Sequence, residues 1–426
     1  MTDTLRIPAN LPAAADPAVA IVRTLTGAGH QALLAGGCVR DLLLGLSPQD
    51  YDVATDAPPE RVGALFPATR QVGAQFGVVL VKQRRRWVEV ATFRCDGPYL
   101  DGRRPATVTL TDAQHDALRR DFTVNGMFLD PLALRVIDYV GGQVDLAAGV
   151  IRAIGDPAAR FGEDHLRLLR AVRFAARLGF AIEPVTLAAI REHAPKLARV
   201  APERVREELE KMLGHATRGA AWGLLRETGL LPHLWPEAGW EPGAFDATAE
   251  LLRRLPPDAP FELALAVLLA DRTPREIERI ARALTLSNEQ RETTAWLVAH
   301  ARDLDDPSSP TLADLKRRMA HAAFPLLRQL AAARHARLGR AAERQAALCA
   351  RLAAIPPDAV QPPPLITGED LIQRGLPPGP RYKDLLDRLY TRQLDEQIRT
   401  RDDALRTLDD LLAAPPATPP TGSPPP

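Results

Sequence analysis

Residues 31–57 read QALLAGGCVRDLLLGLSPQDYDVATDA, and the expected fold of the N-terminal part of the chain rests on this stretch. It opens with an apolar run, residues 31–35, that predicts a short buried strand. Gly36 and Gly37 follow, and the leucine spacing after them predicts a short helix. A glycine turn leading into a helix can present backbone N–H groups to a phosphate. Arg40 would add a planar hydrogen-bond donor one turn further on.

Two carboxylates, Asp50 and Asp52, stand near the end of the same stretch. Residues two apart on an extended strand point to one face, so both side chains are expected to aim together. Their charges repel unless a cation lies between them, and Mg²⁺ prefers oxygen ligands while keeping positions open for substrate phosphates. A Gly-Gly pair alone is more often a tight turn, and an Asp-x-Asp alone is usually a loop or a helix cap. The combination favours a phosphate and metal site.

Composition sets broad limits on the protein class. A chain of 426 residues exceeds one ordinary core, so two to four domains are expected. Aromatic residues are only 5% while Ala, Leu and Arg are abundant, which favours a mostly helical protein. The net charge of +1 does not indicate a nucleic-acid partner, although a local basic groove can be hidden in a balanced total. Three scattered cysteines without a Cys-x-x-Cys predict neither a zinc site nor disulfides, and no apolar run is long enough to span a membrane, so a cytoplasmic protein is expected.

The flanking segments predict a small sheet with helices in the first third of the chain. A helix is expected at residues 16–29, with Asp16 as its N-cap. Alternating, valine-rich residues predict a hairpin whose strands are residues 78–82 and 87–93. Residues 95–112 combine glycines, prolines and charges, which predicts a long loop.

A strong helical pattern begins at residue 161 with FGEDHLRLLRAVRFAARLGF. At about 100° per residue, Asp164, Arg167, Arg170 and Arg173 lie on one arc of the expected helix. The solvated face of an amphipathic helix would explain this arc equally well. However, an Asp and an Arg one turn apart place an acceptor beside a donor fork, which matches the amino group and ring nitrogen shared by cytosine and adenine. Uracil and guanine present the reverse order and would leave buried groups unpaired.

These motifs resemble those of the class II tRNA nucleotidyltransferase and bacterial poly(A) polymerase family. The family's Gly-Gly-x-Val-Arg-Asp, Leu-Leu-Gly and Asp-x-Asp elements match residues 36–52. An acid before an apolar-Ala-Thr-Phe-Arg run, an Arg-Arg-Asp-Phe-Thr-x-Asn-Ala block and a Glu-Asp-x-x-Arg motif match residues 89–94, 119–126 and 163–167, with Gly126 in place of the usual Ala. Residues 203–213 resemble the next block, a helix with a structural role. The resemblance covers about residues 30–213.

The resemblance implies an activity and a set of site residues. The expected reaction is template-independent addition of C, C and A to the 3′ end of tRNA from CTP and ATP, with release of pyrophosphate. Two Mg²⁺ ions would be held by Asp50, Asp52 and Glu89, although Glu89 by its position alone is simply an exposed strand residue. The expected nucleotide-binding residues are Gly36, Gly37, Arg40, Arg120, Asp164, Arg167, Arg170 and Arg173. Two alternatives stay open: a poly(A) polymerase or A-adding enzyme, and, from another class, a catalytically silent RNA-binding protein.

The implied fold class is α+β, with a small mixed-sheet nucleotidyltransferase head like a polymerase beta palm, followed by an all-α neck, body and tail. The expected boundaries are a flexible lead-in at residues 1–15, the head at 16–150, a helical neck with the nucleotide-selecting helix at 151–215, a helical body at 216–355, an RNA-binding tail at 365–412 and a disordered Pro-rich end at 413–426.

Overall fold

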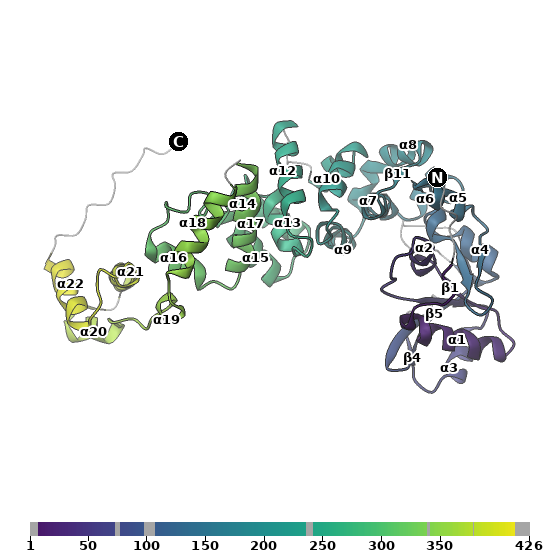
Figure 1. Cartoon of the computed structure of the whole chain (residues 1–426), viewed down its shortest axis with the longest axis horizontal. Helices are drawn as coiled ribbons and strands as arrows, with labels where there is room; N and C mark the ends of the chain where they lie inside the picture. The colour runs from purple at the N-terminus through teal and green to yellow at the C-terminus, as the bar shows by residue number, and fades with distance from the viewer. Residues whose placement is uncertain are drawn as a thin grey trace. The chain divides into compact units, whose positions relative to one another are not determined.

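The computed structural model describes residues 7–72, 77–97, 107–235, 242–338, 341–377 and 379–413 (Figure 1). Half of the predicted loop and nearly all of the predicted Pro-rich end, residues 98–106 and 414–426, lie outside the described residues, as do residues 1–6 of the predicted lead-in. Contacts divide the chain into a first unit, Met1–Ala249 with Arg279–Leu286, and a second unit, Glu250–Glu278 with Ser287–Pro426. The first unit contains a mixed sheet and helices, and the second is helical, so the predicted α+β class is confirmed.

The first unit is built on a seven-stranded sheet with the strand order β3-β4-β5-β2-β1-β8-β9. The strands are β1 Ala32–Ala35, β2 Asp52–Thr55, β3 Thr69–Gln71, β4 Val78–Gln83, β5 Arg86–Thr92, β8 Phe128–Asp130 and β9 Arg135–Ile137. Strands β2 and β5 run parallel, with Val53 opposite Val90, whereas the other neighbouring pairs are antiparallel. The strand and hairpin predictions therefore hold to within about one residue.

Helices cover both faces of this sheet (Figure 1). Helices α1 Asp16–Gly27 and α3 Pro59–Leu65 pack on one face, where Val79, Val81, Val88 and Val90 are buried. On the other face, α4 Ala113–Leu118 packs against a cluster that includes Leu33, Phe93 and Phe128. Helix α2 Gly37–Leu43 follows β1 directly, as the sequence predicts. The alternation of each strand therefore decides which side chains face α1 and which face the opposite side.

The predicted N-cap of the first helix is wrong. Ala15 occupies the N-cap position and makes no side-chain cap, because the short 3₁₀ helix Ala13–Ala15 leads straight into α1 with helical backbone angles. The Asp16 carboxylate instead accepts a hydrogen bond from Arg84 Nη1 at 2.7 Å. Arg84 lies in the β4–β5 turn, so this exposed pair joins the helix start to the hairpin tip.

The predicted loop at residues 95–112 is wrong at both ends. Strands β6 Arg94–Asp96 and β7 Val108–Leu110 form a separate two-stranded antiparallel sheet. The Gly97 N–H donates to the Thr107 carbonyl at 2.8 Å and extends the ladder by one step. Strands of three residues carry too little alternation to be detected in a sequence.

The predicted continuous helix from residue 161 is in fact two helices, α6 Pro157–Glu163 and α7 Arg167–Leu178. Asp164 separates them with an extended backbone, at φ −141° and ψ 105°. Its carboxylate accepts the Leu166 N–H at 3.1 Å, which replaces the helical hydrogen bond with a side-chain bond. Asp164 and Arg167 therefore do not share one helical arc.

The rest of the first unit is mainly helical. Its elements are the 3₁₀ turns Thr123–Asn125 and Ala194–Arg199, the two-residue strands β10 Val150–Ile151 and β11 Ala181–Ile182, and the helices α5 Gly142–Ala148, α8 Pro184–His193, α9 Pro202–Leu213, α10 Arg218–Glu227, α11 Leu231–Leu234 and α12 Pro242–Arg254. Helix α9 contains the predicted neck block and packs against α7.

The second unit is helical, and α12 and α14 each have residues in both units. The elements are α13 Phe261–Leu268, α14 Pro274–Ala283, α15 Asn288–His300, α16 Leu312–Met319, α17 Phe324–Arg337, α18 Ala341–Ala353, α19 Pro357–Val360, α20 Gly368–Gln373, α21 Pro380–Leu394 and α22 Arg401–Ala413. Helices α20, α21 and α22 enclose an apolar cluster around Leu371, Leu389 and Leu408. Within the described residues, no helix combines the length and apolar composition needed to cross a membrane.

Candidate active site

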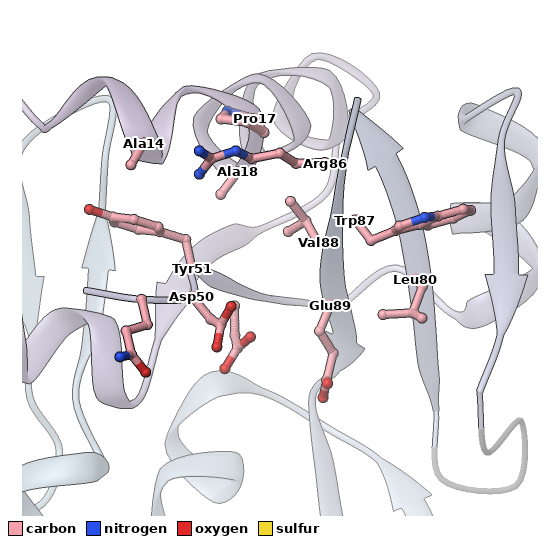
Figure 2. Close-up of a pocket in the computed structure, with 12 residues that line it drawn as sticks. Ala14, Pro17, Ala18, Asp50, Tyr51, Leu80, Arg86, Trp87, Val88 and Glu89 are labelled. Carbon is pink, nitrogen blue, oxygen red and sulfur yellow. The ribbon is translucent and has the colours of Figure 1, made fainter. Parts of the chain in front are cut away.

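Three carboxylates gather where β2 begins beside β5. Val53 and Val90 pair across the parallel strands, so Asp52 and Glu89, which precede them, stand at one level. Both are exposed, whereas Val53, Val88 and Val90 are buried. Asp50 lies two residues before the strand, and Figure 2 shows the carboxylates of Asp50 and Glu89 directed to the same side. The sheet register thus brings together the three predicted metal-binding residues.

Burial and the neighbouring carboxylates make ionisation of Asp52 less favourable than it is in water. Although Asp52 is partly open to solvent, loss of hydration is the largest cause that raises its pKa, and the charges of Glu89 and Asp50 raise it further. Arg120 opposes them, and the net result is a pKa of about 6. Among the described residues, no group of three His, Cys, Asp or Glu side chains forms a ready-made metal site. The carboxylates therefore interact electrostatically without converging into a coordination shell.

Two cavities meet at Asp52. The first, the carboxylate cavity, has a volume of about 370 Å³ and is lined by Asp50, Asp52 and Glu89 together with residues of α1, β4 and β5. The second, the arginine pocket, has a volume of about 450 Å³. Its lining contains the predicted residues Gly36, Gly37, Arg40, Arg120, Asp164, Arg167, Arg170 and Arg173, and in addition Asp52, Arg119, Asp121, Asn125, Phe174 and Arg177. The structure therefore collects all eight predicted nucleotide-binding residues in one pocket.

Gly36 allows the chain to turn from β1 into α2 against the arginine pocket. Its φ is +73°, a conformation that favours glycine, and a Cβ at this position would lie 3.0 Å from Arg120 Nη1. Gly37 has no such constraint, because its nearest neighbour to a Cβ would be Arg40 Nη2 at 3.6 Å. The first glycine of the pair is thus required by both the backbone and the neighbouring arginine.

Arg40 and Arg173 are held by the protein rather than presented freely. Arg40 is buried and donates to Asp41 Oδ1 at 2.8 Å and to Asn125 Oδ1 at 2.6 Å. Arg173 is also buried and donates to Glu208 Oε2 at 2.6 Å. Their charges contribute to the positive potential of the pocket, but their hydrogen bonds mainly hold α2 and α7 in place.

Arg170 forms a bridge between the head and the helices that follow it. Its Nε donates to Asp121 Oδ2 at 2.8 Å, and its Nη1 lies 3.8 Å from Glu208 Oε1 on α9. Burial opposes ionisation of Asp121, but the charge and hydrogen bond of Arg170, with help from Asn125 and the Phe122 N–H, lower its pKa to about 2. The ion pair is therefore intact at neutral pH. Asp121 belongs to the Arg-Arg-Asp-Phe-Thr block, yet sequence reasoning did not select it.

Asp164 and Arg167 line the same pocket, and each has a protein partner. Arg204 on α9 donates to both Asp164 oxygens, at 3.1 Å and 2.8 Å. Arg167 donates to Glu163 Oε2 and to the carbonyls of Arg160 and Arg119. By count, two of the five guanidinium N–H groups of Arg167 and one lone pair of Asp164 stay available. Nothing in a helical pattern identifies Arg204, because it lies 40 residues away from Asp164.

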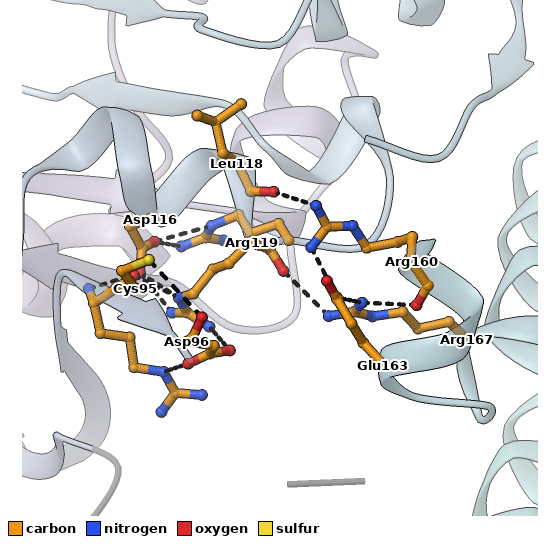
Figure 3. Close-up of polar contacts among 10 residues, drawn as sticks. Cys95, Asp96, Asp116, Leu118, Arg119, Arg160, Glu163 and Arg167 are labelled. Atoms are coloured by element: carbon orange, nitrogen blue, oxygen red, sulfur yellow. Dashed lines mark hydrogen bonds and ion pairs between the residues drawn. The ribbon is translucent and has the colours of Figure 1, made fainter. Parts of the chain in front are cut away.

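A further set of polar contacts ties this region to the two-stranded sheet (Figure 3). Arg119 donates to Asp116 and to the Arg94 carbonyl, and its Nη1 lies 3.9 Å from Asp96 Oδ2. Arg160 donates to the Leu118 carbonyl at 2.9 Å and to Glu163 at the same distance. The end of α4, at Leu118 and Arg119, is thus held by contacts with both the two-stranded sheet and α6.

Comparisons with known proteins support the family that the sequence motifs resemble, over most of the chain. Residues 32–152 match the family described as the Poly A polymerase head domain, and residues 179–240 match the probable RNA and SrmB-binding site of polymerase A. The chain is 34% identical over 397 residues to the CCA-adding enzyme of Geobacillus kaustophilus (strain HTA426), covering 92% of this chain and 95% of that one. With the CCA-adding enzyme of Geobacillus stearothermophilus it is 44% identical over 225 residues, about half of each chain at 53% and 55%.

Solved structures agree. The crystal structure of the Bacillus stearothermophilus CCA-adding enzyme in complex with CTP is similar with a TM-score of 0.80 and 30% identity, over 95% of this chain and 98% of that one. The Thermotoga maritima CCA-adding enzyme complexed with tRNA_CCA shares the fold, with a TM-score of 0.66 and 21% identity. The predicted family is therefore confirmed, and this chain belongs to the class II CCA-adding enzyme family.

Proposed function

We propose that this protein adds C, C and A to the 3′ end of tRNA, using CTP and ATP and releasing pyrophosphate. The observation that carries the proposal is the meeting of two unlike cavities at Asp52. One is lined by three carboxylates, and the other is rich in arginine and contains Asp164 and Arg167. A triphosphate suits the arginine pocket, and a 3′-hydroxyl approaching from the carboxylate cavity would reach the α-phosphate from the opposite side. A cytoplasmic location, where tRNA is processed, goes with this proposal.

The carboxylate set fits divalent cations. Asp50, Asp52 and Glu89 provide oxygen ligands of the kind that Mg²⁺ prefers. Burial raises the pKa of Asp52, and the charges of Glu89 and Asp50 raise it further, so a cation at this position would be stabilising. Two Mg²⁺ ions held by these three residues would neutralise phosphate charge and make the 3′-hydroxyl more acidic. Among protein groups, Arg120 is the cation that already stabilises ionised Asp52, and it lines both the arginine pocket and a smaller cavity beside Glu89.

The arginine pocket has the groups needed to hold and select a nucleotide. Arg120 and Arg170 would neutralise the triphosphate, while Gly36 lets the backbone approach it closely. Asp164 would accept the exocyclic amino group of cytosine or adenine, and Arg167 would donate to the adjacent ring nitrogen. Because Arg204 and Glu163 already hold these two side chains, the selecting pair is ordered before the base binds.

An addition assay tests this proposal. One tRNA that ends at its discriminator base is incubated with Mg²⁺ and with CTP alone, ATP alone, or both. The expected outcome is two additions with CTP and completed CCA with both nucleotides. Long A tails from ATP alone, on unrelated RNA too, would instead identify a poly(A) polymerase. Absence of incorporation in every mixture would contradict the proposal and favour a silent RNA-binding protein.

A further inference from the structure

A basic and aromatic surface continues from the carboxylates toward the β3 edge of the sheet. Residues directly opposite one another on neighbouring strands share a face. Arg70 on β3 is opposite Leu80 on β4, and Leu80 is opposite Glu89 on β5, so one row ends at the carboxylates. Lys82 and Trp87 form the next row on the same face, two residues further along β4 and β5. We call Arg70, Lys82 and Trp87 the Trp87 platform.

The platform has an unusual composition for a solvated sheet face. Trp87 is 39% exposed, with the Arg70 guanidinium 4.5 Å and the Lys82 ammonium 5.8 Å from its ring centroid. Both cations are exposed, and within the described part of the chain neither forms an ion pair or a side-chain hydrogen bond. By contrast, Arg84 at the tip of the same hairpin is paired with Asp16. Among the described residues, no carboxylate neutralises these two cations, so both can attract phosphate groups.

The platform is placed to meet a molecule that also reaches the carboxylates. Trp87, Leu80 and Glu89 line the same carboxylate cavity, and Figure 2 shows them on two neighbouring strands. Along a strand, Trp87 and Glu89 are separated by about 7 Å. The triphosphate is assigned to the arginine pocket, which contains none of the three platform residues. An occupant of the platform must therefore approach from the other side of Asp52.

We propose that the Trp87 platform binds the single-stranded 3′ end of the RNA substrate, with a base stacked on Trp87 and phosphates bound by Arg70 and Lys82. An exposed aromatic ring between cations is the arrangement that binds single strands with little sequence preference. Such tolerance suits a site through which the strand advances by one nucleotide after each addition. The inference deepens the proposed function and rests on it for the identity of the RNA.

Steady-state kinetics on a tRNA that lacks CCA test the proposal, with the KM for RNA and the KM for CTP measured separately. W87A and the double variant R70E/K82E are each expected to raise the KM for RNA about tenfold and to leave the KM for CTP within about twofold. W87F should retain nearly normal RNA binding because it keeps a stacking ring. R135E is the matched control, since Arg135 is an exposed arginine on β9 at the opposite edge of the same sheet.

Three results would decide the matter. An unchanged KM for RNA in both W87A and R70E/K82E, with normal thermal melting, would overturn the platform while leaving the proposed function intact. A raised KM for CTP alone would overturn it by assigning the platform to the nucleotide. If the wild-type protein incorporates no nucleotide, the proposed function fails separately. Fluorescence anisotropy with a 3′-tailed RNA then still tests the platform, because each lost phosphate contact should lower the slope of log K against log salt by about 0.7.

Discussion

Ionised Asp52 destabilises the folded protein, whereas the proposed binding of Mg²⁺ requires the ionised carboxylate. Its pKa of about 6 lies above the usual value, so folding makes protonation of Asp52 more favourable than it is in the unfolded chain. For such an acid, the stabilisation is present below the unfolded pKa and disappears as the pH rises through about 6. Without divalent cations, Asp52→Asn should therefore melt at a higher temperature than the wild type above pH 6 and at nearly the same temperature at pH 4.

The same substitution should lower nucleotide addition by at least about 10³-fold, because a neutral amide cannot replace a carboxylate in a charge cluster built for cations. Thermal melts in EDTA across pH 4 to 8 and single-turnover addition assays measure the two effects. A stability difference that does not change with pH would contradict the electrostatic origin.

Selection of the base is expected to depend on Asp164 and Arg167 as a pair. Asp164→Ala should reduce the preference for CTP over UTP by about 10²-fold, since a site built to hydrogen-bond one edge loses its penalty for the reverse edge. Arg177→Ala is the control, because Arg177 lines the same pocket but is exposed. It should change the KM for CTP without changing the preference. Competition assays with labelled CTP and UTP compare the two variants. If Asp164→Ala and Arg177→Ala lost the preference for CTP equally, selection of the base by Asp164 and Arg167 would be contradicted.

At the scale of elements, two glycines with similar φ angles, Gly36 before α2 and Gly45 after it, are expected to differ in their effect on activity. Gly36 and Gly45 both have positive φ, +73° and +69°, but of the two only Gly36 has an arginine within 4 Å of the position that a Cβ would take. Gly36→Ala and Gly45→Ala should each destabilise the protein by about 1 kcal/mol from backbone strain. Only Gly36→Ala should lower kcat/KM for CTP, by about tenfold or more, because it displaces Arg120 from the pocket. Equal activities of the two variants would contradict this assignment.

The join between α7, α9 and the head depends on a buried charge network. The lowered pKa of Asp121 corresponds to about 2 kcal/mol of stability, present above pH 4 and lost as the pH falls through about 2. Asp121→Asn should lower the free energy of unfolding by about 3 kcal/mol at pH 7, because Arg170 is left without its main partner. Asp246→Asn, at an exposed pair with Arg226, should change it by less than about 0.5 kcal/mol. Urea unfolding measures both, and similar losses would contradict the network.

At the scale of the whole molecule, contacts divide the chain into two units, and all candidate site residues lie in the first. Ligands that bind only the folded state stabilise the unit that holds them. Saturating CTP with Mg²⁺ should therefore raise the melting temperature of one calorimetric transition by several degrees and leave the other unchanged. Asp52→Asn should abolish the Mg²⁺-dependent part of this shift. A single transition that moves as one would show that the units unfold together.

Three consecutive basic residues of the second unit, on α16, belong to a helix surface on which each cation is paired. Lys316 is buried and contacts Glu396, Arg317 pairs with Asp387, and Arg318 pairs with Asp303. These contacts hold α16 against α21 and the preceding turn, so the three cations contribute to packing. The RNA-binding role of the tail at residues 365–412 stays a prediction.

Local pattern was sufficient for strands β1, β4 and β5, the glycine turn and the exposed position of Glu89, because alternation and φ preferences act over a few residues. It also sufficed for the family, whose motifs are short and contiguous. Tertiary structure decided the rest. The parallel pairing of β2 with β5 sets Asp52 beside Glu89 across 37 residues of chain, and the capping bond of Asp164 breaks a helix that periodicity alone would continue. Arg204 and Glu208 on α9 hold the site through long-range ion pairs, which depend on packing and carry no local signal.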